Sequence, residues 1–373
     1  FVGIPLNSVG LRHRQIFTNY AGFANAEYEV SDALIVQGGI RYTQANIDYN
    51  GCSQDTGDGF AAGVFSNFYN VLIRGPAGLS PVAIQPGGCF TLNTTTLNPE
   101  AVVRSFDQDN LSWRAGVQYK PSRDVLVYGN VSKGYKGGAF PFNLATFDSG
   151  LDPASQESVL AYEAGFKLGL LDGAVQFNSA AFYMDYRDKQ VVGTINQPGL
   201  GPINKLINVP KSRVYGAEVE LNVTPLQGLS FNLNGSYIRS AVKGGFTNIN
   251  NLGATQNFDG TDLPFVPHWQ INGGIRYELQ PIGTLTPFVT TNVMYNSRAN
   301  SGLGEVAAFT IEPYTLVDAT VGIENSNKKW RAFVWGRNIF NETYSTATFR
   351  ALDTLERYMG NPATYGVTFA VNY

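Results

Sequence analysis

The sequence is short of charge. Charged residues make up 15% of its 373 positions, against about 25% in a typical globular protein. The formal net charge is -3 and no block of Lys and Arg occurs, so the chain lacks the basic stripe of a nucleic-acid-binding protein. It also lacks any run of about 20 apolar residues, which excludes a helical membrane span. The longest stretch without charge, residues 75–99, contains four prolines and is predicted to be a loop.

Motifs for catalysis and for metal binding are also missing. No Gly-rich phosphate loop, pair of catalytic carboxylates or metal-ligand spacing occurs, so we expect neither an enzyme nor a bound cofactor or metal. His268 and Asn272 lie close together in the sequence. They do not support a Ser-His-Asn hydrolase, because no serine belongs to the same motif.

What the sequence does have is a period of two. Between residues 229 and 237, Leu, Phe, Leu, Gly and Tyr alternate with Ser, Asn, Asn and Ser, which is typical of a strand with two different faces. No stretch of comparable length keeps helical spacing, so almost no helix is expected. We predict about 13 strands, over residues 15–28, 32–46, 109–120, 124–135, 158–170, 173–186, 212–224, 228–240, 268–279, 284–297, 312–325, 329–338 and 362–373.

The connections alternate strictly between short and long. Short turns are predicted at 29–32, 121–124, 171–173, 225–228, 281–284 and 325–328, where turn-forming residues gather. Long polar loops are predicted at 48–108, 136–157, 187–211, 241–267, 298–311 and 339–361. Outer-membrane barrels have short periplasmic turns and long extracellular loops, and strands of about 10 to 15 residues exceed those of soluble sheets. The pattern therefore predicts an all-β fold, an antiparallel transmembrane β-barrel.

The two faces of each strand then have different surroundings. We expect lipid contact for Phe166, Leu168, Phe231, Leu233, Ile275, Tyr277, Val367 and Phe369. We expect the lumen to be lined by Glu218, Glu220, Asn232, Asn234, Arg276 and Glu278. Aromatic girdles at the lipid boundary are predicted to include Tyr28, Tyr119, Tyr183, Tyr186, Tyr237, Tyr295, Tyr314 and Trp330. A soluble β-sandwich would show the same alternation, and Tyr favours strands in general.

The strand count has a further implication. The first predicted strand precedes a short turn and the last follows a long loop, so the chain would begin outside the cell and end in the periplasm. Bacterial single-chain barrels have an even number of strands. We therefore expect that residues 1–373 lack an N-terminal part of the barrel.

Four segments, in order, resemble TonB-dependent outer-membrane receptors. The first spans residues 124–140 and includes Val-Tyr-Gly-Asn-Val-Ser-Lys-Gly-Tyr-Lys; the others are 212–220, 314–318 and 335–344, the last reading Trp-Gly-Arg-Asn-Ile-Phe-Asn-Glu-Thr-Tyr. The terminal strand, with Phe369, Val371 and Tyr373, is similar to the insertion signal of that class. The resemblance covers residues 109–373. It implies a 22-stranded barrel, of which residues 1–373 would be the C-terminal portion, with about nine strands, the plug and the TonB-binding box outside this chain.

The resemblance also implies a function and a location. Such a receptor imports a scarce, bulky nutrient across the bacterial outer membrane, and TonB supplies the energy by acting on the plug. A ferric siderophore is the expected substrate, with cobalamin, haem or an oligosaccharide as alternatives, because specificity lies in loops and plug and not in the fold. The other expected partners are outer-membrane lipid and lipopolysaccharide. A passive porin with an open lumen and a soluble all-β interaction protein remain alternatives from other classes.

The two cysteines and the loop side chains supply the candidate sites. Cys52 and Cys89 lie in the predicted loop 48–108, which is extracellular on this topology, so we predict a disulfide between them. For a receptor, aromatic and basic residues at the lumen mouth are the expected ligand contacts, because they stack on rings and neutralise carboxylates. The candidates are Arg12, Arg14, Tyr69, Arg74, Tyr135, Lys136, Arg350, Arg357 and Tyr358. Contacts to lipopolysaccharide are the alternative for the cluster around His13 and for Arg350 and Arg357.

Overall fold

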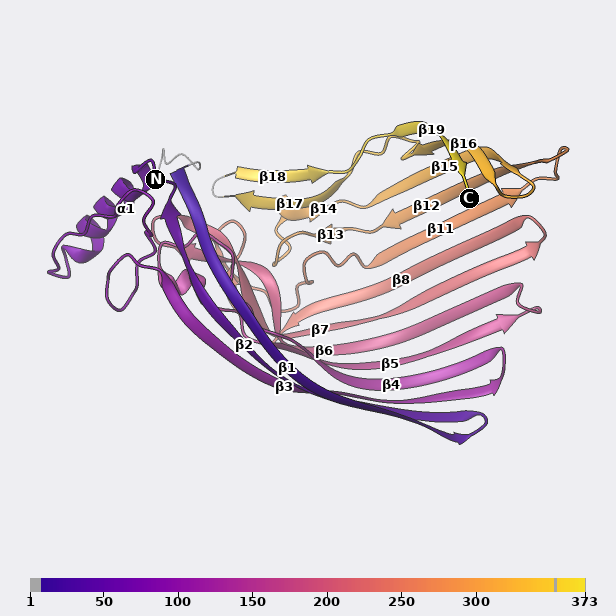
Figure 1. Cartoon of the computed structure of the whole chain (residues 1–373), viewed down its shortest axis with the longest axis horizontal. Helices are drawn as coiled ribbons and strands as arrows, with labels where there is room; N and C mark the ends of the chain where they lie inside the picture. Colours follow the sequence, from indigo (N-terminus) through magenta and orange to yellow (C-terminus); the bar gives the residue numbers. More distant parts are fainter. Residues whose placement is uncertain (1–7, 352–353, 373) are drawn as a thin grey trace.

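The computed structural model describes residues 8–351 and 354–372 and contains one large antiparallel sheet (Figure 1). Every predicted strand is present, and Tyr373 lies outside the described residues. Neighbours along the sheet follow the chain, in the order β1 (Val9–Ser31), β2 (Leu34–Asp55), β3 (Val102–Ser122), β4 (Val125–Lys136), β5 (Glu157–Leu170), β6 (Val175–Gln197), β7 (Gly201–Leu226), β8 (Leu229–Lys243), β11 (Trp269–Glu278), β12 (Leu285–Asn296), β15 (Tyr314–Asn325), β16 (Trp330–Arg337) and β19 (Thr364–Val371).

The sheet is bent into a trough, with the short turns at one end and the long connections at the other (Figure 1). β1 begins at the loop end and β19 finishes at the turn end, as the alternation predicts. Gly228, in the turn between β7 and β8, has φ 84°, and a Cβ there would lie 2.6 Å from the carbonyl oxygen of Glu278. Only glycine fits that turn. Among the described residues no pairing joins β1 to β19.

One predicted loop is wrong. Residues 187–211 are mostly the outer halves of β6 and β7, which stay paired from Lys189 and Val209 up to Gln197 and Gly201 and project as a hairpin. The reason is physical. Beyond the bilayer neither face of a strand must be apolar, so the alternation fades while the backbone hydrogen bonds continue. In the same way β2 extends to Asp55 and β3 begins at Val102, which shortens the predicted loop 48–108 to residues 56–101.

The connections contain the remaining elements. A helix that the sequence analysis did not predict, α1 (Phe60–Tyr69), continues as a π-helical turn over Asn70–Arg74. It buries Ala61, Phe65 and Tyr69, which follow a spacing of four. Short 3-10 turns span Asp148–Leu151 and Ala307–Phe309, and short strands are β9 (Thr247–Ile249), β10 (Thr255–Asn257), β13 (Ala299–Asn300), β14 (Thr310–Ile311), β17 (Ser345–Ala351) and β18 (Thr354–Met359). In the part of the chain that the structure describes, no helix has the length and apolarity to cross a membrane.

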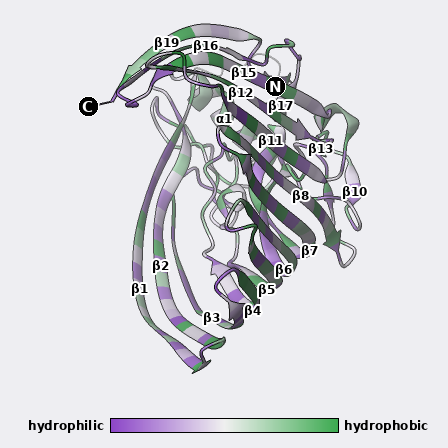
Figure 2. Ribbon diagram, turned by 90° about the vertical axis from the view of Figure 1, so that its right-hand side faces the viewer, coloured by the Kyte–Doolittle hydropathy of each residue, from purple (hydrophilic) through white to green (hydrophobic). Residues whose placement is uncertain are grey.

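The sheet has one apolar and one polar face, and the registers agree with the prediction. Val223, Phe231 and Ile275 are direct cross-strand neighbours on one face, and hydrophilic and hydrophobic residues alternate along the strands (Figure 2). On the apolar face Val367 is 80% exposed and Phe369 is 67% exposed. A soluble sandwich would bury such residues under a second sheet, so their exposure favours contact with lipid.

Aromatic side chains form two rows on the apolar face. The row toward the loop end includes Trp113, Tyr162, Tyr183, Tyr215, Tyr237 and Trp269, and the row toward the turn end includes Tyr28, Tyr119, Tyr277 and Trp330. Eight residues separate Trp269 from Tyr277 on β11, which corresponds to about 20 Å for a strand tilted by about 40°. That separation fits the apolar band of a barrel, about 25 Å tall.

Two of the predicted girdle residues are on the other face. Tyr186 follows Asp185, which shares the face of Tyr183, so Tyr186 points to the polar side. Tyr314 is the cross-strand neighbour of Asn296 on the polar face and stacks on Tyr344, with ring centroids 4.5 Å apart. Each of these tyrosines is next in the sequence to a residue on the apolar face, Asp185 or Thr315. The predicted girdle was based on aromatic residues near strand ends and did not consider the face.

Candidate functional site

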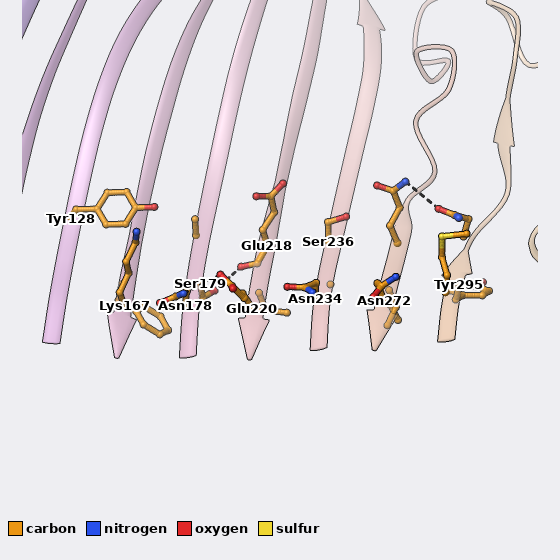
Figure 3. Close-up of a pocket in the computed structure, with 18 residues that line it drawn as sticks. Tyr128, Lys167, Asn178, Ser179, Glu218, Glu220, Asn234, Ser236, Asn272 and Tyr295 are labelled. Carbon is orange, nitrogen blue, oxygen red and sulfur yellow. Dashed lines mark hydrogen bonds between the residues drawn. The ribbon is translucent and has the colours of Figure 1, made fainter. Parts of the chain in front are cut away.

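The polar face carries a groove of about 450 Å³ that crosses the sheet from β4 to β12 (Figure 3). It runs from residues near the turn between β5 and β6 to the loop ends of β11 and β12. One row across this wall consists of Lys167, Asn178, Glu220, Asn234 and Asn272, which are cross-strand neighbours. The Nδ2 atom of Asn178 donates to the Glu220 carboxylate at 3.0 Å, and Asn222 donates to its other oxygen at 3.1 Å. The amide and carboxylate groups of this row can form hydrogen bonds with a polar molecule in the groove.

Arg276 lies on the same face, closer to the turns. Its guanidinium is 2.9 Å from the carboxylate of Glu278 and 3.4 Å from that of Glu324. It also lies 4.4 Å from the centroid of the Phe288 ring. The charge of Arg276 is therefore neutralised within the wall, and the predicted placement of Arg276 and Glu278 on the polar face agrees with the registers.

A second groove, of about 480 Å³, lies on the polar face of β1, β2 and β3 toward the loop end. We call it the upper groove. Phe17, 58% exposed, offers a ring, and Arg41 offers a guanidinium whose Nε donates to Thr43 at 3.2 Å. Gln108 and Asn110 add amides. A ring, a cation and amides together suit an anionic ligand with aromatic groups. The sequence analysis did not single out these residues, because each is one member of an ordinary polar strand face.

Above the grooves the outer loops are fastened to one another. The Tyr69 hydroxyl is hydrogen-bonded to the carbonyl oxygens of Phe90 and Thr146, at 2.5 and 2.8 Å. The amide oxygen of Gln197, on the projecting hairpin, accepts hydrogen bonds from Thr146 N at 3.2 Å and from its hydroxyl at 3.0 Å. Residues 56–101, residues 137–156 and the hairpin therefore form one unit, which we call the outer-loop assembly.

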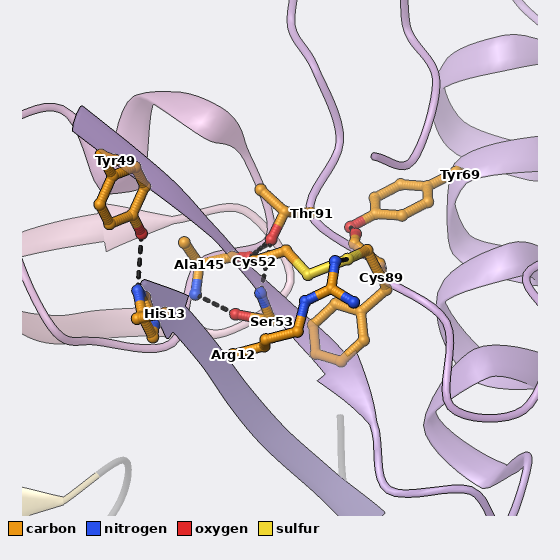
Figure 4. The surroundings of a disulfide bond; sticks show 10 residues. Arg12, His13, Tyr49, Cys52, Ser53, Tyr69, Cys89, Thr91 and Ala145 are labelled. Carbon is orange, nitrogen blue, oxygen red and sulfur yellow. Dashed lines mark hydrogen bonds between the residues drawn. A yellow bond between two sulfur atoms is a disulfide. The ribbon is translucent and has the colours of Figure 1, made fainter. Parts of the chain in front are cut away.

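The predicted disulfide is present (Figure 4). Cys52 lies at the end of β2 and Cys89 in the following connection, with their Cα atoms 5.8 Å apart. Beside it, Thr91 Oγ1 accepts from the backbone N–H of Ser53 at 2.8 Å and donates to the carbonyl of Ala145 at 3.0 Å. The disulfide and these buried hydrogen bonds hold the loop 56–101 against β2.

Two titratable groups of the outer-loop assembly have shifted pKa values. Burial alone would raise the pKa of Asp55, but hydrogen bonds from the backbone N–H groups of Gly87, Ala62, Gly59 and Gly57 outweigh it and hold this pKa well below its usual value. Burial lowers the pKa of His13, whose Nδ1 is 2.6 Å from the Tyr49 hydroxyl. Asp55 is therefore a charged anchor at the start of the loop, and His13 is favoured in its neutral form.

The structure moves Tyr69 and Arg74 out of the predicted ligand set. Tyr69 is fully buried and its hydroxyl is occupied by backbone carbonyls. Arg74 is 8% exposed, and its guanidinium donates to the carbonyl oxygen of Ser80 at 2.8 Å and to Asn98 Oδ1 at 2.8 Å. The polar groups of both side chains are used within the outer loops.

The other candidates divide between the two faces. Arg12, Arg14 and Tyr135 share the apolar face, because side chains alternate along a strand and their cross-strand neighbours are on that side. Arg12 reaches the disulfide, with Nη2 3.3 Å from Cys89 Sγ. Arg12 and Arg14 therefore lie toward the outer wall and not at the lumen mouth that the sequence analysis predicted for them. Tyr135 also contributes to the lining of the upper groove, so it remains beside the mouth.

The other four predicted ligand contacts lie at the loop end of the sheet and differ in how exposed they are. Lys136 finishes β4 and is exposed, and Arg357 and Tyr358 are exposed on β18. Arg350 is half-buried and donates to the carbonyl oxygen of Asn251 at 3.1 Å. The structure does not bring the nine candidates into one cluster. Within the described ranges no group of three or more His, Cys, Asp or Glu side chains is placed to hold a metal ion.

Comparison with known proteins identifies relatives of the whole described sheet. A family model described as "TonB dependent receptor-like, beta-barrel" matches residues 3–339. The rhizobactin receptor of Rhizobium meliloti (strain 1021) is 24% identical over 408 residues, which cover 99% of this chain and 45% of the relative. The pesticin receptor of Yersinia pestis is 25% identical over 286 residues, covering 74% of this chain and 38% of the relative. The chain thus spans less than half the length of these curated relatives.

Solved structures with the same fold are more distant in sequence. The ferric yersiniabactin uptake receptor FyuA from Yersinia pestis aligns with a TM-score of 0.72 at 16% identity, over 98% of this chain and 47% of that one. The siderophore receptor PiuA from Acinetobacter baumannii aligns with a TM-score of 0.67 at 15% identity, over 96% of this chain and 43% of that one. At such identities the alignments demonstrate a shared fold.

Proposed function

This chain belongs to the family of TonB-dependent receptor β-barrels, and from that membership we propose that it is part of a receptor that imports a ferric siderophore with energy supplied through TonB. Members of this family are transport receptors of the bacterial outer membrane and not enzymes. The observation that carries the proposal is the family match over residues 3–339. The polar face of the sheet carries the two grooves, and the outer loops form one assembly.

The names of the relatives support the substrate class. Those relatives are receptors named for rhizobactin and pesticin, and the two solved structures are titled as receptors for ferric yersiniabactin and for a siderophore. Cobalamin, haem and oligosaccharides remain the alternative cargoes within the same architecture. We further propose that residues 1–373 are the C-terminal portion of the barrel, that residues 48–108 include its extracellular disulfide-bonded loop, and that lipid and lipopolysaccharide contact its apolar face.

The ligand contacts that we propose combine the upper groove with the loop-end candidates. Phe17 and Arg41 lie on the polar face at the mouth, and Lys136, Arg357 and Tyr358 are exposed at the same end of the sheet. Cations attract the carboxylates or catecholates of a ferric chelate, and rings stack on its aromatic groups. Arg350 is a weaker candidate, because its guanidinium holds the loop around Asn251.

A transport assay tests the proposal against the porin alternative. The full-length receptor is produced in an outer-membrane receptor-deficient strain, and uptake of iron-labelled siderophores is compared with and without TonB. We expect saturable uptake that needs TonB and the proton gradient. Uptake of small solutes that is independent of TonB and proportional to concentration would support a passive porin instead.

A pair of matched variants tests the ligand contacts. Replacement of Lys136 and Arg357 by Ala is expected to weaken binding of an anionic ferric chelate, and to do so more at low than at high salt, because salt screens exposed charges. The control is Arg123→Ala together with Lys120→Ala, two exposed cations near the turn at the opposite end of the sheet. Equal affinity of the first pair and the wild type at both salt concentrations would contradict the proposed contacts while leaving the transport class intact.

A further inference from the structure

A groove of about 370 Å³ lies on the polar face of β1 to β4, adjacent to the upper groove. The two grooves share Arg41 and Ser112. The strand registers arrange the side chains of this groove in two rows. The row nearer the loop end contains Phe23, Arg41 and Ser112, and the row below it contains Asn25, Gly39, Arg114 and Ser132. We call these residues the two-arginine site.

Gly39 makes room in the middle of the site. It is the direct cross-strand neighbour of Asn25 on β1 and of Arg114 on β3. A Cβ at Gly39 would clash with the side-chain oxygen of Asn25 and would lie 3.5 Å from Cγ of Arg114. Because glycine has no side chain, the amide of Asn25 and the side chain of Arg114 border the same open space.

The positive charge of the site is not neutralised within the described part of the chain. Arg41 and Arg114 are exposed, hold diagonal positions on β2 and β3, and form no ion pair there. Diagonal side chains lie about 7 Å apart at Cβ. By register the nearest carboxylates on this face are those of Glu27 and Glu163, each one row toward the turns and two strands from Arg114, about 12 Å between Cα atoms. An anion between the two guanidinium groups would therefore relieve repulsion that the fold leaves in place.

The polar face is divided by charge along the sheet. In the rows below the site, β5 and β7 carry the carboxylates of Glu163, Glu218 and Glu220 and one cation, Lys167. The two free guanidinium groups are on β2 and β3. An anion that enters the lumen is therefore attracted to the wall at β2 and β3 and repelled by the wall at β5 to β7.

The side chains of the site suit an aromatic group with two anionic substituents. Guanidinium groups form paired, charge-assisted hydrogen bonds with carboxylates. Phe23 is 70% exposed and offers a ring for stacking next to Arg41. Arg114 directly follows Trp113 of the aromatic row at the loop end. The site therefore lies at the outer end of the lumen, level with the lipid boundary.

From this placement we propose that the two-arginine site binds a part of the imported ferric chelate that carries two anionic oxygen groups on or beside a ring, such as two carboxylates or a catecholate and a carboxylate. The inference deepens the proposed import function and rests on it. It narrows the cargo to chelates that expose at least two negative charges. A neutral ferric hydroxamate, cobalamin and a neutral oligosaccharide lack the groups that two guanidinium ions bind.

The first test is a binding measurement that does not depend on the identity of the cargo. The purified full-length receptor, in a neutral detergent, is titrated with isophthalate, which has two carboxylates on one ring, and with benzoate, which has one. We expect isophthalate to bind at least tenfold more tightly than benzoate, and its affinity to fall as the salt concentration rises. Isophthalamide, which has a similar shape and no charge, should not bind.

Matched variants locate that binding. Arg41→Gln with Arg114→Gln should abolish the preference for isophthalate, because both guanidinium groups are lost. Arg41→Lys with Arg114→Lys should keep part of it, because lysine retains the charge but not the paired hydrogen bonds. The control is Arg331→Gln. Arg331 is an exposed cation on the same face of β16, near the turn end, and its replacement should leave the tenfold preference unchanged.

Uptake of ferric chelates separates this inference from the import proposal. We expect the Gln double variant to bind the imported chelate at least tenfold more weakly, and Arg331→Gln to bind it like the wild type. TonB-dependent uptake of a chelate that the wild type and the Gln double variant bind equally well would overturn the two-arginine site and leave the import proposal intact. Absence of TonB-dependent uptake for every ferric chelate would contradict the import proposal, and the cargo assignment with it.

Two results of the isophthalate titration would also overturn the inference. One is equal affinity of the wild type for isophthalate and benzoate, or an equal loss of the preference in Arg331→Gln. The other is no binding of isophthalate to the wild type together with a lower unfolding temperature of the Gln double variant. That combination would mean that a carboxylate of the plug, and not a ligand, fills the site.

Discussion

Replacing Leu233 by Arg should strongly destabilise the protein in a bilayer. Leu233 lies on the apolar face and is 41% exposed. It is midway along β8 between Tyr237, which pairs with Trp269 in one aromatic row, and Leu229, which pairs with Tyr277 in the other. Four residues separate it from each row, so it lies about 10 Å from each lipid boundary.

At that depth a charged side chain lowers the stability of the folded protein in the bilayer. A lipid-facing Arg near the midplane of a barrel costs about 2–4 kcal/mol, which is roughly a 30- to 700-fold decrease in the folding equilibrium constant. Asn234→Arg is the matched control, because Asn234 is the next residue on β8, exposed and on the polar face. Its replacement should change the free energy of unfolding by less than about 1 kcal/mol.

Both variants can be measured by urea unfolding in phospholipid vesicles, with Trp fluorescence as the signal. The expected result is a large decrease of the unfolding midpoint for Leu233→Arg and little change for Asn234→Arg. Equal losses would mean that both faces of β8 meet a similar environment, and a larger loss at Asn234 would mean that the faces are reversed. Either outcome would refute the assignment of the apolar face to lipid.

Replacing Cys52 and Cys89 by Ser should destabilise the loop 56–101 by about 4 kcal/mol, the loop-closure value for a separation of 37 residues. Limited proteolysis should then cut this loop faster and leave the sheet intact. An unchanged cleavage rate would contradict a stabilising role of the disulfide. Asp55→Ala should cost about 2–3 kcal/mol of loop stability, because charged hydrogen bonds to four N–H groups are lost. Since the pKa of Asp55 is lowered in the folded state, this stabilisation is present above about pH 4 and is lost as the pH falls below it; protease protection of the wild type should decline there, whereas Asp55→Asn should show no such pH dependence. Tyr69→Phe should cost about 1 kcal/mol of loop stability through the lost bonds to Phe90 and Thr146, with ligand affinity unchanged; a selective loss of affinity would return Tyr69 to the ligand site.

The sequence was sufficient for those features that depend on near neighbours along the chain. A strand residue faces the side opposite to its immediate neighbours, so the period of two was enough to assign Phe231 and Asn232 to different faces, and turn-forming residues placed the six hairpins. The disulfide was also predictable, because Cys52 and Cys89 are the two cysteines of the chain. For Arg12 and Arg14 the alternation with His13 already indicated a common face, but not which face.

The projecting hairpin of β6 and β7 was missed for a different reason. Its residues lie beyond the lipid boundary, where both faces meet water or other loops, so neither face is required to be apolar. The helix α1 was missed because it is a single short helix in a loop, with its buried side chains packed on Phe90 and Leu92. Its stability comes from those contacts more than from helix propensity.

Only the tertiary structure decided where the loop residues and the charge clusters lie. Tyr69 and Arg74 look like free aromatic and basic loop residues until Phe90, Thr146 and Ser80 are brought against them. Lys133 and Lys243 are 110 positions apart in the sequence and lie in adjacent rows of the same face only because the strand registers place them there. The burial of a side chain and the charge around it depend on contacts between segments that are distant in the sequence. The order of residues along one strand does not specify those contacts.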